Sequence, residues 1–272
     1  MPPSFANTLQ VNSYDLHNLG FALNVPGGVR DLAGGREYPA VEAPGRDGLV
    51  LSSTLPKVGA RELVLPGHVV ADTHATLLTY LDALKYRLSL GLLDVRLADD
   101  TTKRIFARLS RFTSLPAPRE LARRIAEIEI RLLAHDPYWY TVALDSTAFT
   151  TSNTAMALGT APTRPTMIRI TGICVNPIVI YKNSAGIEIR RMGFTYSQPG
   201  ATDKIEIDCI NQTITKTVSG TPSNAASLLT SGDFITLDPQ HGDYPNSAWP
   251  TLNLSVSSGT PTCLCEYYRA WQ

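Results

Sequence analysis

The stretch AHDPYWYTV, residues 134–142, places three aromatic side chains directly after an Asp-Pro pair. Aromatic residues make up only 8% of the chain, so three in succession need a surface that covers them. Pro137 donates no backbone hydrogen bond and biases Asp136 towards an extended conformation, so the pair is expected to end a strand. Two interpretations of the stretch are open, the lining of a ligand site and a joint between two domains. We favour the joint, made by Asp136, Pro137, Tyr138, Trp139 and Tyr140.

The composition favours two folded domains of different character. With 272 residues, the chain is near the size at which a single core divides into two. Hydrophobic residues make up 43% and charged residues 18%, enough apolar material for substantial cores. Charged residues are denser before residue 141, whereas all four cysteines follow it. We predict a first domain over 1–140, a linker or extended arm rich in Thr, Ser, Ala and Pro over 141–165, and a second domain over 166–272.

The charge balance and the hydropathy pattern limit the kinds of partner. Lys plus Arg and Asp plus Glu number 24 each, so the chain lacks the basic excess that binds phosphate backbones. Its start has no basic run followed by an apolar stretch, and no window is apolar for long enough to cross a bilayer. We therefore expect a cytoplasmic protein with no membrane contact and no specific nucleic-acid binding.

One helix is predicted in the first domain, within DTHATLLTYLDALKYRLSLG at residues 72–91. Asp72 or Thr73 can cap its start, and Gly91 suits its end. Strands flank it, because ARELVLPGHVV and LLDVRLADDTTKRIFARLSRF alternate apolar and polar residues. We predict a mainly β fold, in which this domain is a β-sandwich or split barrel with one α-helix at about 72–90. Leucines spaced by four, three and four residues form the buried side of the helix: Leu77, Leu81, Leu84 and Leu88.

The segment ELARRIAEIEIRLLAHDP, from residue 120, fits two structures. As a strand it would bury every second residue from 126 to 134 and expose the charged residues between them. As a helix it would bury a different set: Leu121, Ile125, Ile128 and Leu132. Helix propensity favours the second structure, and the residues alone leave both open.

From Thr166 onward the chain consists of short runs of alternating apolar and polar residues, such as TMIRITGI, PIVIYK and DKIEIDC. Turn signals separate them, including Asn176-Pro177 and Pro199-Gly200. Many short strands with frequent turns are typical of an antiparallel β-sandwich or barrel. We predict an antiparallel β-sandwich for the second domain.

Known catalytic and metal-binding patterns are missing from the sequence. No histidine lies in a zinc spacing, Cys263 and Cys265 have no second ligand pair, and no Walker, G-x-S-x-G or dinucleotide motif occurs. Free buried thiols are the simpler interpretation of the cysteines. We therefore predict no enzyme, no cofactor and no metal. The acids that would be needed for glycan hydrolysis lie in or beside alternating strands, where an exposed polar position explains them: Asp203, Glu206, Asp208, Asp233 and Asp238.

Two loops carry residue types that suit recognition. PGRDGLV, residues 44–50, is explained as a turn, and it would equally serve as a subunit contact through Arg46 and Asp47. DPQHGDYPNSAW, residues 238–249, is explained as a plain turn-rich loop. It would also suit a sugar or a protein partner through four side chains: His241, Asp243, Tyr244 and Trp249.

Several motifs in the same order resemble the distal tail protein (Dit) family of long-tailed, siphovirus-type bacteriophages. They are PGRDG after an N-terminal strand region, one helix in a β-rich domain, HDPYWY, NPIVIY, KIEIDCINQTI and SGDFITLDPQHGDYPNSAW. Together they cover most of the chain. The loop at 238–249 departs from the turn usual in that family.

The resemblance implies a structural virion protein and not an enzyme. It implies a first domain that forms a hexameric ring, followed by a galectin-like or carbohydrate-module-like β-sandwich, with residues 125–134 as a strand. The ring would join the tail tube protein to the tail hub protein and to fibre or receptor-binding proteins, and DNA would pass through its channel. The protein would be assembled in the host cytoplasm and located at the virion tail tip. Arg46 is then our candidate for a contact between copies.

Two other functions stay open at the level of the sequence. The first is a carbohydrate-binding module or lectin-like protein, which would use the second domain and its loop with Tyr244 and Trp249. The second is a hydrolase of cell-wall glycans, which would need an acid pair that the sequence does not make evident.

Overall fold

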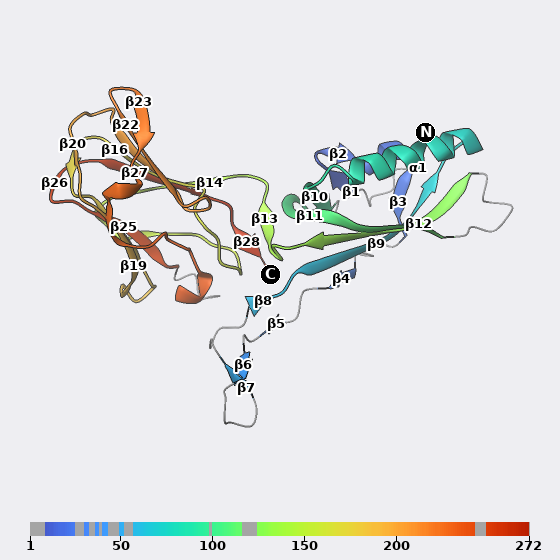
Figure 1. Cartoon of the computed structure of the whole chain (residues 1–272), viewed down its shortest axis with the longest axis horizontal. Helices are drawn as coiled ribbons and strands as arrows, with labels where there is room; N and C mark the ends of the chain where they lie inside the picture. The colour runs from blue at the N-terminus through green and yellow to red at the C-terminus, as the bar shows by residue number, and fades with distance from the viewer. Residues whose placement is uncertain are drawn as a thin grey trace. The chain divides into compact units, whose positions relative to one another are not determined.

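The computed structural model divides into two compact units, Met1–Trp139 and Tyr140–Gln272. Each is a β-structure, and one α-helix lies in the first (Figure 1). Among the described residues, the helix is too short and too polar to cross a membrane. The structure describes residues 9–24, 30–32, 36–37, 40–42, 49–51, 57–97, 100–115, 124–242 and 249–271.

The first unit is built on one antiparallel sheet in the order β2-β1-β10-β11-β12-β9-β3, with β4 also paired to β9. Its longest strands, β9, β11 and β12, lie side by side (Figure 1). The strands are β1 (Leu9–Val11), β2 (Tyr14–Asp15), β3 (Phe21–Leu23), β4 (Arg30–Leu32), β9 (Arg61–Val70), β10 (Leu93–Leu97), β11 (Asp100–Leu115) and β12 (Ile125–Ala134). A short 3-10 turn, η1 (Leu16–Leu19), joins β2 to β3. Two small antiparallel pairs are β5 (Arg36–Glu37) with β8 (Lys57–Val58), and β6 (Ala40–Glu42) with β7 (Leu49–Leu51).

Helix α1 (His74–Leu88) confirms the predicted helix. Thr73 caps its start, since its side chain accepts a hydrogen bond from the Thr76 amide at 3.1 Å. Gly91 follows its end with a φ of 90°, a conformation that glycine adopts without strain. Three of the four predicted leucines are buried, and Leu81 is half-buried. The helix packs on one face of the sheet, the inner face.

The inner face of the sheet and the helix enclose the core of the first unit. Every second residue of the central strands contributes to it, because side chains alternate between the two faces of a strand. The face of the sheet turned away from α1, the outer face, carries the intervening residues. Core side chains with no exposure include Leu63 and Leu65 of β9, Leu93 and Val95 of β10, Ile105 and Ala107 of β11, and Ile130 and Leu132 of β12.

The structure decides the ambiguous segment in favour of a strand. β12 pairs with β11 on one side and with β9 along its whole length on the other, so that Ile130 lies opposite both Phe112 and Leu65. Glu127 is exposed between the buried Ala126 and Ile128. Pairing with two neighbouring strands stabilises this strand by more than the local preference for a helix disfavours it. The strand predicted from the resemblance is therefore confirmed.

The second unit is an antiparallel β-sandwich, as predicted. One sheet has the order β14-β27-β16-β21-β22-β23 and the other β15-β25-β18-β19-β24, while β20, β17 and β26 form a small third sheet. The strands are β14 (Asp145–Phe149), β15 (Thr154–Ala155), β16 (Met167–Thr171), β17 (Cys174–Val175), β18 (Ile178–Lys182), β19 (Glu188–Phe194), β20 (Ser197–Gln198), β21 (Lys204–Asp208), β22 (Thr213–Val218), β23 (Thr221–Asn224), β24 (Leu229–Gly232), β25 (Thr251–Ser255), β26 (Ser258–Gly259) and β27 (Thr262–Tyr267). Short terminal and 3-10 elements are β13 (Trp139–Thr141), η2 (Ala226–Leu228), η3 (Pro239–His241) and β28 (Ala270–Trp271).

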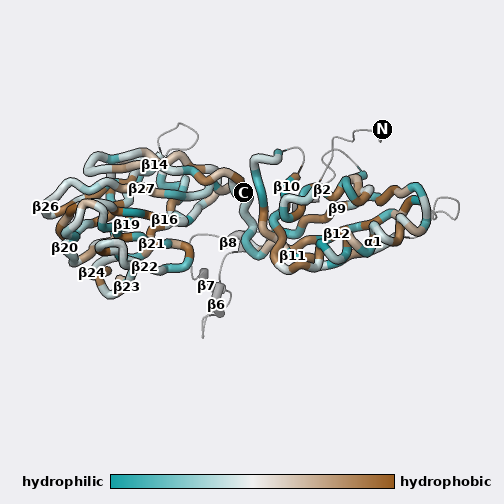
Figure 2. Tube along the Cα trace, turned by 90° about the horizontal axis from the view of Figure 1, so that it is seen from above, coloured by the Kyte–Doolittle hydropathy of each residue, from teal (hydrophilic) through white to brown (hydrophobic). Residues whose placement is uncertain are grey.

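Alternating residues from both large sheets form the single core of this sandwich. Figure 2 shows hydrophobic and hydrophilic residues interspersed along its strands. The core includes Ile168, Ile170, Ile205 and Ile207 from one sheet and Val179, Tyr181, Met192 and Leu254 from the other. All four cysteines are free and buried, and all belong to this core.

The stretch 141–165, expected to be a linker or an extended arm, contains strands that join the sheets of the second unit. β14 pairs with β27, where Thr147 lies opposite Cys265, and β15 pairs with β25. Met156 and Leu158 are buried in the core of the sandwich. Part of the stretch is thus extended chain with a hydrogen-bonded partner.

Candidate functional site

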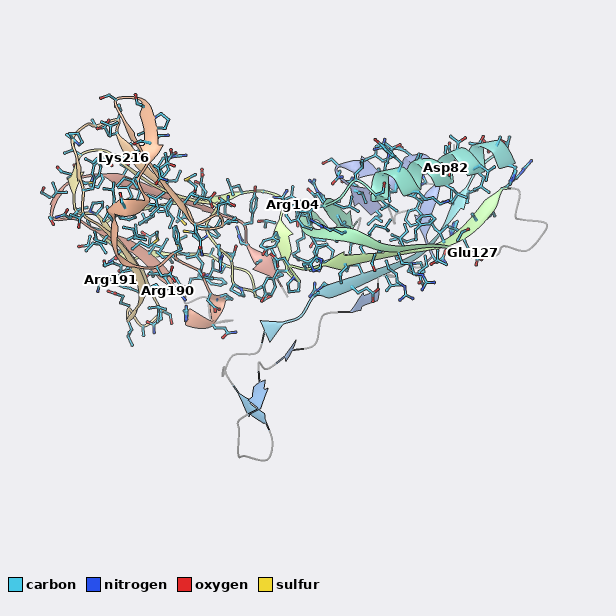
Figure 3. All side chains as sticks on the ribbon, in the orientation of Figure 1. Asp82, Arg104, Glu127, Arg190, Arg191 and Lys216 are labelled. Atoms are coloured by element: carbon cyan, nitrogen blue, oxygen red, sulfur yellow. The ribbon has the colours of Figure 1, made fainter. Side chains whose placement is uncertain are left out.

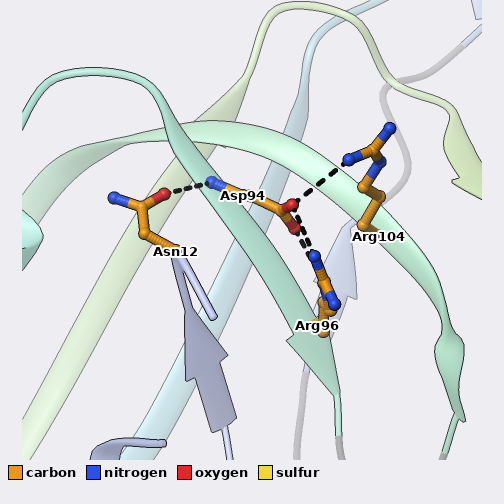
Figure 4. A network of polar contacts seen from close by, with 4 residues as sticks. All are labelled: Asn12, Asp94, Arg96 and Arg104. Carbon is orange, nitrogen blue, oxygen red and sulfur yellow. Dashed lines mark hydrogen bonds and ion pairs between the residues drawn. The ribbon is translucent and has the colours of Figure 1, made fainter. Parts of the chain in front are cut away.

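The outer face of the first unit's sheet holds a network of charged side chains centred on Asp94 of β10 (Figure 4). Arg96 binds this carboxylate with two nitrogens, Nε to Oδ1 at 3.2 Å and Nη2 to Oδ2 at 2.9 Å. Arg104 of β11 approaches Oδ2 with Nη1 at 3.4 Å. The hydrogen bond to Asp94 raises the pKa of Arg96. Two guanidinium groups therefore share one carboxylate.

Hydrogen bonds from a neighbouring turn fix the position of Asp94. Asn12 and Ser13, at the tip between β1 and β2, have φ values of 51° and 64°, in the left-handed region that a tight hairpin requires. The Asn12 side chain accepts a hydrogen bond from the Asp94 amide at 2.9 Å, and the Asn12 amide donates to the Asp94 carbonyl at 2.8 Å. The turn thereby holds β10 at the point where Asp94 lies.

A second charged group lies on the same face, on β12 and β9. Arg131 donates to Glu129 at 2.7 Å from Nε and lies 3.8 Å from Glu62. The hydrogen bond to Glu129 raises the pKa of Arg131. These side chains are about one third exposed, so the pairs contribute little to folding stability and are accessible to a partner.

The predicted joint begins at a turn after β12. That strand ends at Ala134, two residues before Asp136, and Pro137 is buried. The Asp136 side chain accepts a hydrogen bond from the Tyr138 amide at 3.3 Å, which supports the turn. Trp139 packs against the core of the first unit, and the boundary between the two units falls between Trp139 and Tyr140. The sealing of a joint by these rings stays a prediction.

Contacts with Arg269 hold the chain segment with which the second unit begins. The Thr141 amide donates to the Arg269 carbonyl at 3.0 Å, and the Arg269 amide donates to Thr141 Oγ1 at 3.1 Å. The Arg269 guanidinium binds Asp145 Oδ1 at 2.6 and 3.1 Å, and this hydrogen bonding raises its pKa. The beginning and the end of the second unit are thus tied together.

The described part of the loop at 238–249 is anchored on Tyr181, a fully buried residue of β18. The Tyr181 hydroxyl donates to the Asp238 carbonyl at 3.1 Å and accepts from the Asp238 amide at 2.9 Å. His241 Nδ1 lies 3.2 Å from the same hydroxyl, and the two rings meet edge to face. Burial raises the pKa of Tyr181. Trp249 packs against the core, and Asp243 and Tyr244 lie outside the described residues.

The acids considered for glycan hydrolysis each have a local partner. Asp203 is buried and accepts from the amides of Gly200 and Ser219, both at 2.9 Å. Burial raises the pKa of Glu206, but hydrogen bonds from Lys204 and Arg169 outweigh this and lower it overall. Asp208, Asp233 and Asp238 bind Asn211, Arg190 and the Gln240 amide, respectively. These contacts explain all five carboxylates as supports of turns and strand pairs.

Arg46 and Asp47, the predicted subunit contact, lie outside the described residues. Within the described part of the chain, no group of three or more His, Cys, Asp or Glu side chains is placed to hold a metal ion. Burial raises the pKa of Cys209 and Cys263 to about 12, so both thiols stay protonated at neutral pH.

The sequence patterns did not predict the Asp94 network or the role of Tyr181. The alternation in PIVIYK places Tyr181 on the core side of its strand with Val179, and a buried tyrosine requires a partner for its hydroxyl. The alternation therefore indicated that the Tyr181 hydroxyl has a hydrogen-bond partner. No comparable signal existed for Asp94, because its partners come from the turn after β1, from β10 and from β11, and their register depends on tertiary pairing.

Comparison with known proteins finds no matching family model. It also finds no match among curated proteins. Among solved structures, the SPP1 Dit (gp 19.1) protein, described as a paradigm of the hub adsorption apparatus in Gram-positive-infecting phages, is similar with a TM-score of 0.71 at 18% identity. The match covers 98% of this chain and 99% of that chain. A chain of the phage P2 baseplate, in its activated conformation with Ca, is similar with a TM-score of 0.50 at 9% identity, covering 97% and 98%. Over nearly its whole length, therefore, this chain has the fold of a phage distal tail (Dit) protein.

Proposed function

We propose that this protein is a structural component of a phage tail tip, of the distal tail type. One observation carries the proposal: the likeness to the SPP1 Dit protein extends over both units and leaves almost none of either chain unmatched. A β-sandwich alone recurs in many unrelated functions. The order of two different β units, the first with one helix among its described residues, is a more specific likeness than either unit alone.

The use of polar side chains supports a structural role. The carboxylates with the best claim to catalysis hold turns and strand pairs, and the cysteine thiols are buried in the core. Exposed charge lies on the outer face of the first unit's sheet, where Arg108 and Arg111 are exposed and Arg131 is about one third exposed. The protein acts through its surfaces and catalyses no reaction.

In this role, copies of the chain associate into a ring that connects the tail tube protein to the tail hub and to fibre or receptor-binding proteins. Six copies are expected from the family resemblance. A head-to-tail contact that closes on itself leaves no free end, as an adaptor with a central channel for DNA requires. Arg46 and Asp47 stay our candidates for the contact between copies, and residues 136–140 for the joint between the units.

Analytical ultracentrifugation over a concentration range, with and without the tail tube protein of the same phage, tests this proposal. We expect a single closed oligomer whose size does not grow with concentration, and negative-stain images that show a ring with a central hole. A protein that stays monomeric in both conditions and does not bind the tube protein would contradict the proposed function. Binding of the full chain to a glycan array, with no ring, would favour the lectin-like alternative.

A further inference from the structure

A β-bulge in β11 places two arginines side by side on the outer face of the first unit's sheet. Arg108 lies opposite Leu133 and Leu109 opposite Leu132, but the next pair is Arg111 with Arg131, so Ser110 is the extra residue. In a regular strand, residues three apart point to opposite faces. The bulge turns Arg111 to the same face as Arg108, and bulges of this kind commonly re-aim a side chain at a functional surface.

The register of β12 adds a third arginine to this cluster. Arg111 and Arg131 are direct neighbours across the two strands. Like charges in this position repel each other and destabilise the pair. Glu129 and Glu62 balance the positive charge of Arg131. Arg108 and Arg111 are exposed and have no hydrogen bond or ion pair to any described residue. The strand pairing therefore maintains a positive charge that the described part of the unit does not neutralise.

The chemistry of the cluster indicates carboxylates as its ligands. Arginine presents a planar fork of donors that matches a carboxylate, and in this sheet Arg96 already binds Asp94 with two nitrogens. Nucleic acid is less suited, because a phosphate backbone needs a continuous basic track. Here two acids interrupt the basic cluster, since Glu129 and Glu62 both pair with Arg131.

We propose that Arg108 and Arg111, on the bulged part of β11, bind closely spaced carboxylates on an acidic segment of a partner protein. Arg131 and its two acids form the border of this site and orient the segment along the strand. The inference goes beyond the proposed tail role, and it stands or falls independently of ring formation. Figure 3 shows this sheet with its side chains, including Glu127 on β12.

Binding of short labelled probes to the full chain tests the site by fluorescence anisotropy at low and moderate salt. The probes are a peptide of alternating Glu and Ser, the same peptide with Gln in place of Glu, and single-stranded DNA of equal charge. The variants are Arg108→Gln, Arg111→Gln and their combination. Arg124→Gln is the matched control, since Arg124 is exposed in the same unit, has no side-chain hydrogen bond or ion pair to a described residue, and precedes β12 at the end away from Arg131.

We expect the Glu peptide to bind and the Gln peptide not to bind. The combined variant should bind the Glu peptide about tenfold more weakly, without a lowered melting temperature, while Arg124→Gln binds as the parent does. Arg111→Lys should recover only part of the affinity, because lysine keeps the charge but lacks the fork. Equal affinity in the combined variant and the control overturns the proposal. So does DNA that binds more tightly than the Glu peptide through the same arginines.

Discussion

At the scale of single residues, the buried carboxylate of Asp203 is explained by the turns that it holds. Asp203 is 4% exposed and satisfies two backbone amides from separate turns of the second unit, those of Gly200 and Ser219. Its removal would leave two donors unpaired next to the core. Turn carboxylates of this kind are easily mistaken for catalytic acids in a sequence.

We predict that Asp203→Ala lowers the free energy of unfolding by about 2 to 4 kcal/mol. Urea denaturation followed by circular dichroism measures it. Asp233→Ala is the control, because the side chain of Asp233 is 73% exposed and its pair with Arg190 is a surface ion pair. The control should change stability by at most about 0.5 kcal/mol. Equal effects of the two substitutions would contradict the role assigned to Asp203.

The buried thiols predict a loss of stability at alkaline pH. Burial raises the pKa of Cys209 and Cys263 to about 12, whereas a thiol in the unfolded chain titrates near 9.0. Above pH 9 the unfolded chain loses these protons first, so the stabilising contribution is complete below pH 9 and decreases from there towards pH 12. Unfolding free energies measured from pH 8 to pH 11 should therefore decrease in this range, and less steeply in Cys209→Ala. If the unfolding free energy decreases with pH equally steeply in Cys209→Ala and in the parent, the Cys209 thiol is not a cause of the decrease.

At the scale of elements, α1 begins where a cap is available. Thr73 has an extended backbone and accepts the Thr76 amide. We predict that Thr73→Ala lowers the unfolding free energy by about 1 kcal/mol, as the loss of a cap commonly does. Thr79→Ala makes the same chemical change in the middle of the exposed side of the helix, where alanine is the better helix former. It should leave stability unchanged or raise it slightly, and thermal unfolding distinguishes the two signs.

The turn after β12 gives a second prediction at this scale. Trp139 is half-buried and packs against the core of the first unit. We expect Trp139→Ala to lower stability by about 2 kcal/mol, less than the loss of a fully buried tryptophan. Tyr86→Ala is the comparison, because Tyr86 is 67% exposed on α1. Were both variants to melt at the parent's temperature, the packing role of Trp139 would be wrong.

At the scale of the whole molecule, the two compact units predict separable folding. The sandwich has its own continuous core, and the contacts of Arg269 with Thr141 and Asp145 tie its two ends together. We predict that residues 140–272 expressed alone unfold cooperatively and give dispersed amide signals in NMR spectra. A chain that begins at residue 166 lacks β14 and β15, and it should be less stable or fail to fold. If only the shorter piece folds, the boundary at Trp139 is misplaced.

Much of the fold follows from local patterns. The leucine spacing of α1 and the alternation of strands such as β16, β18 and β21 predicted a mainly β chain with one helix. The stretch at 141–165 was harder, because a strand on the edge of a sheet need not carry a strong apolar pattern. β14 depends on its pairing with β27, a strand more than a hundred residues later in the chain.

The sequence by itself determined which residues are apolar, at what period, and where turns and caps interrupt them; these are local properties, and they set the class of each unit. Only the tertiary structure decided that residues 125–134 form a strand, since two neighbouring ladders outweigh helix propensity. It also decided which charges meet. Asp94 joins Arg96 and Arg104, and Arg111 comes to lie beside Arg131, because register and a bulge place side chains on a face, and both are set by pairing between strands distant in the sequence.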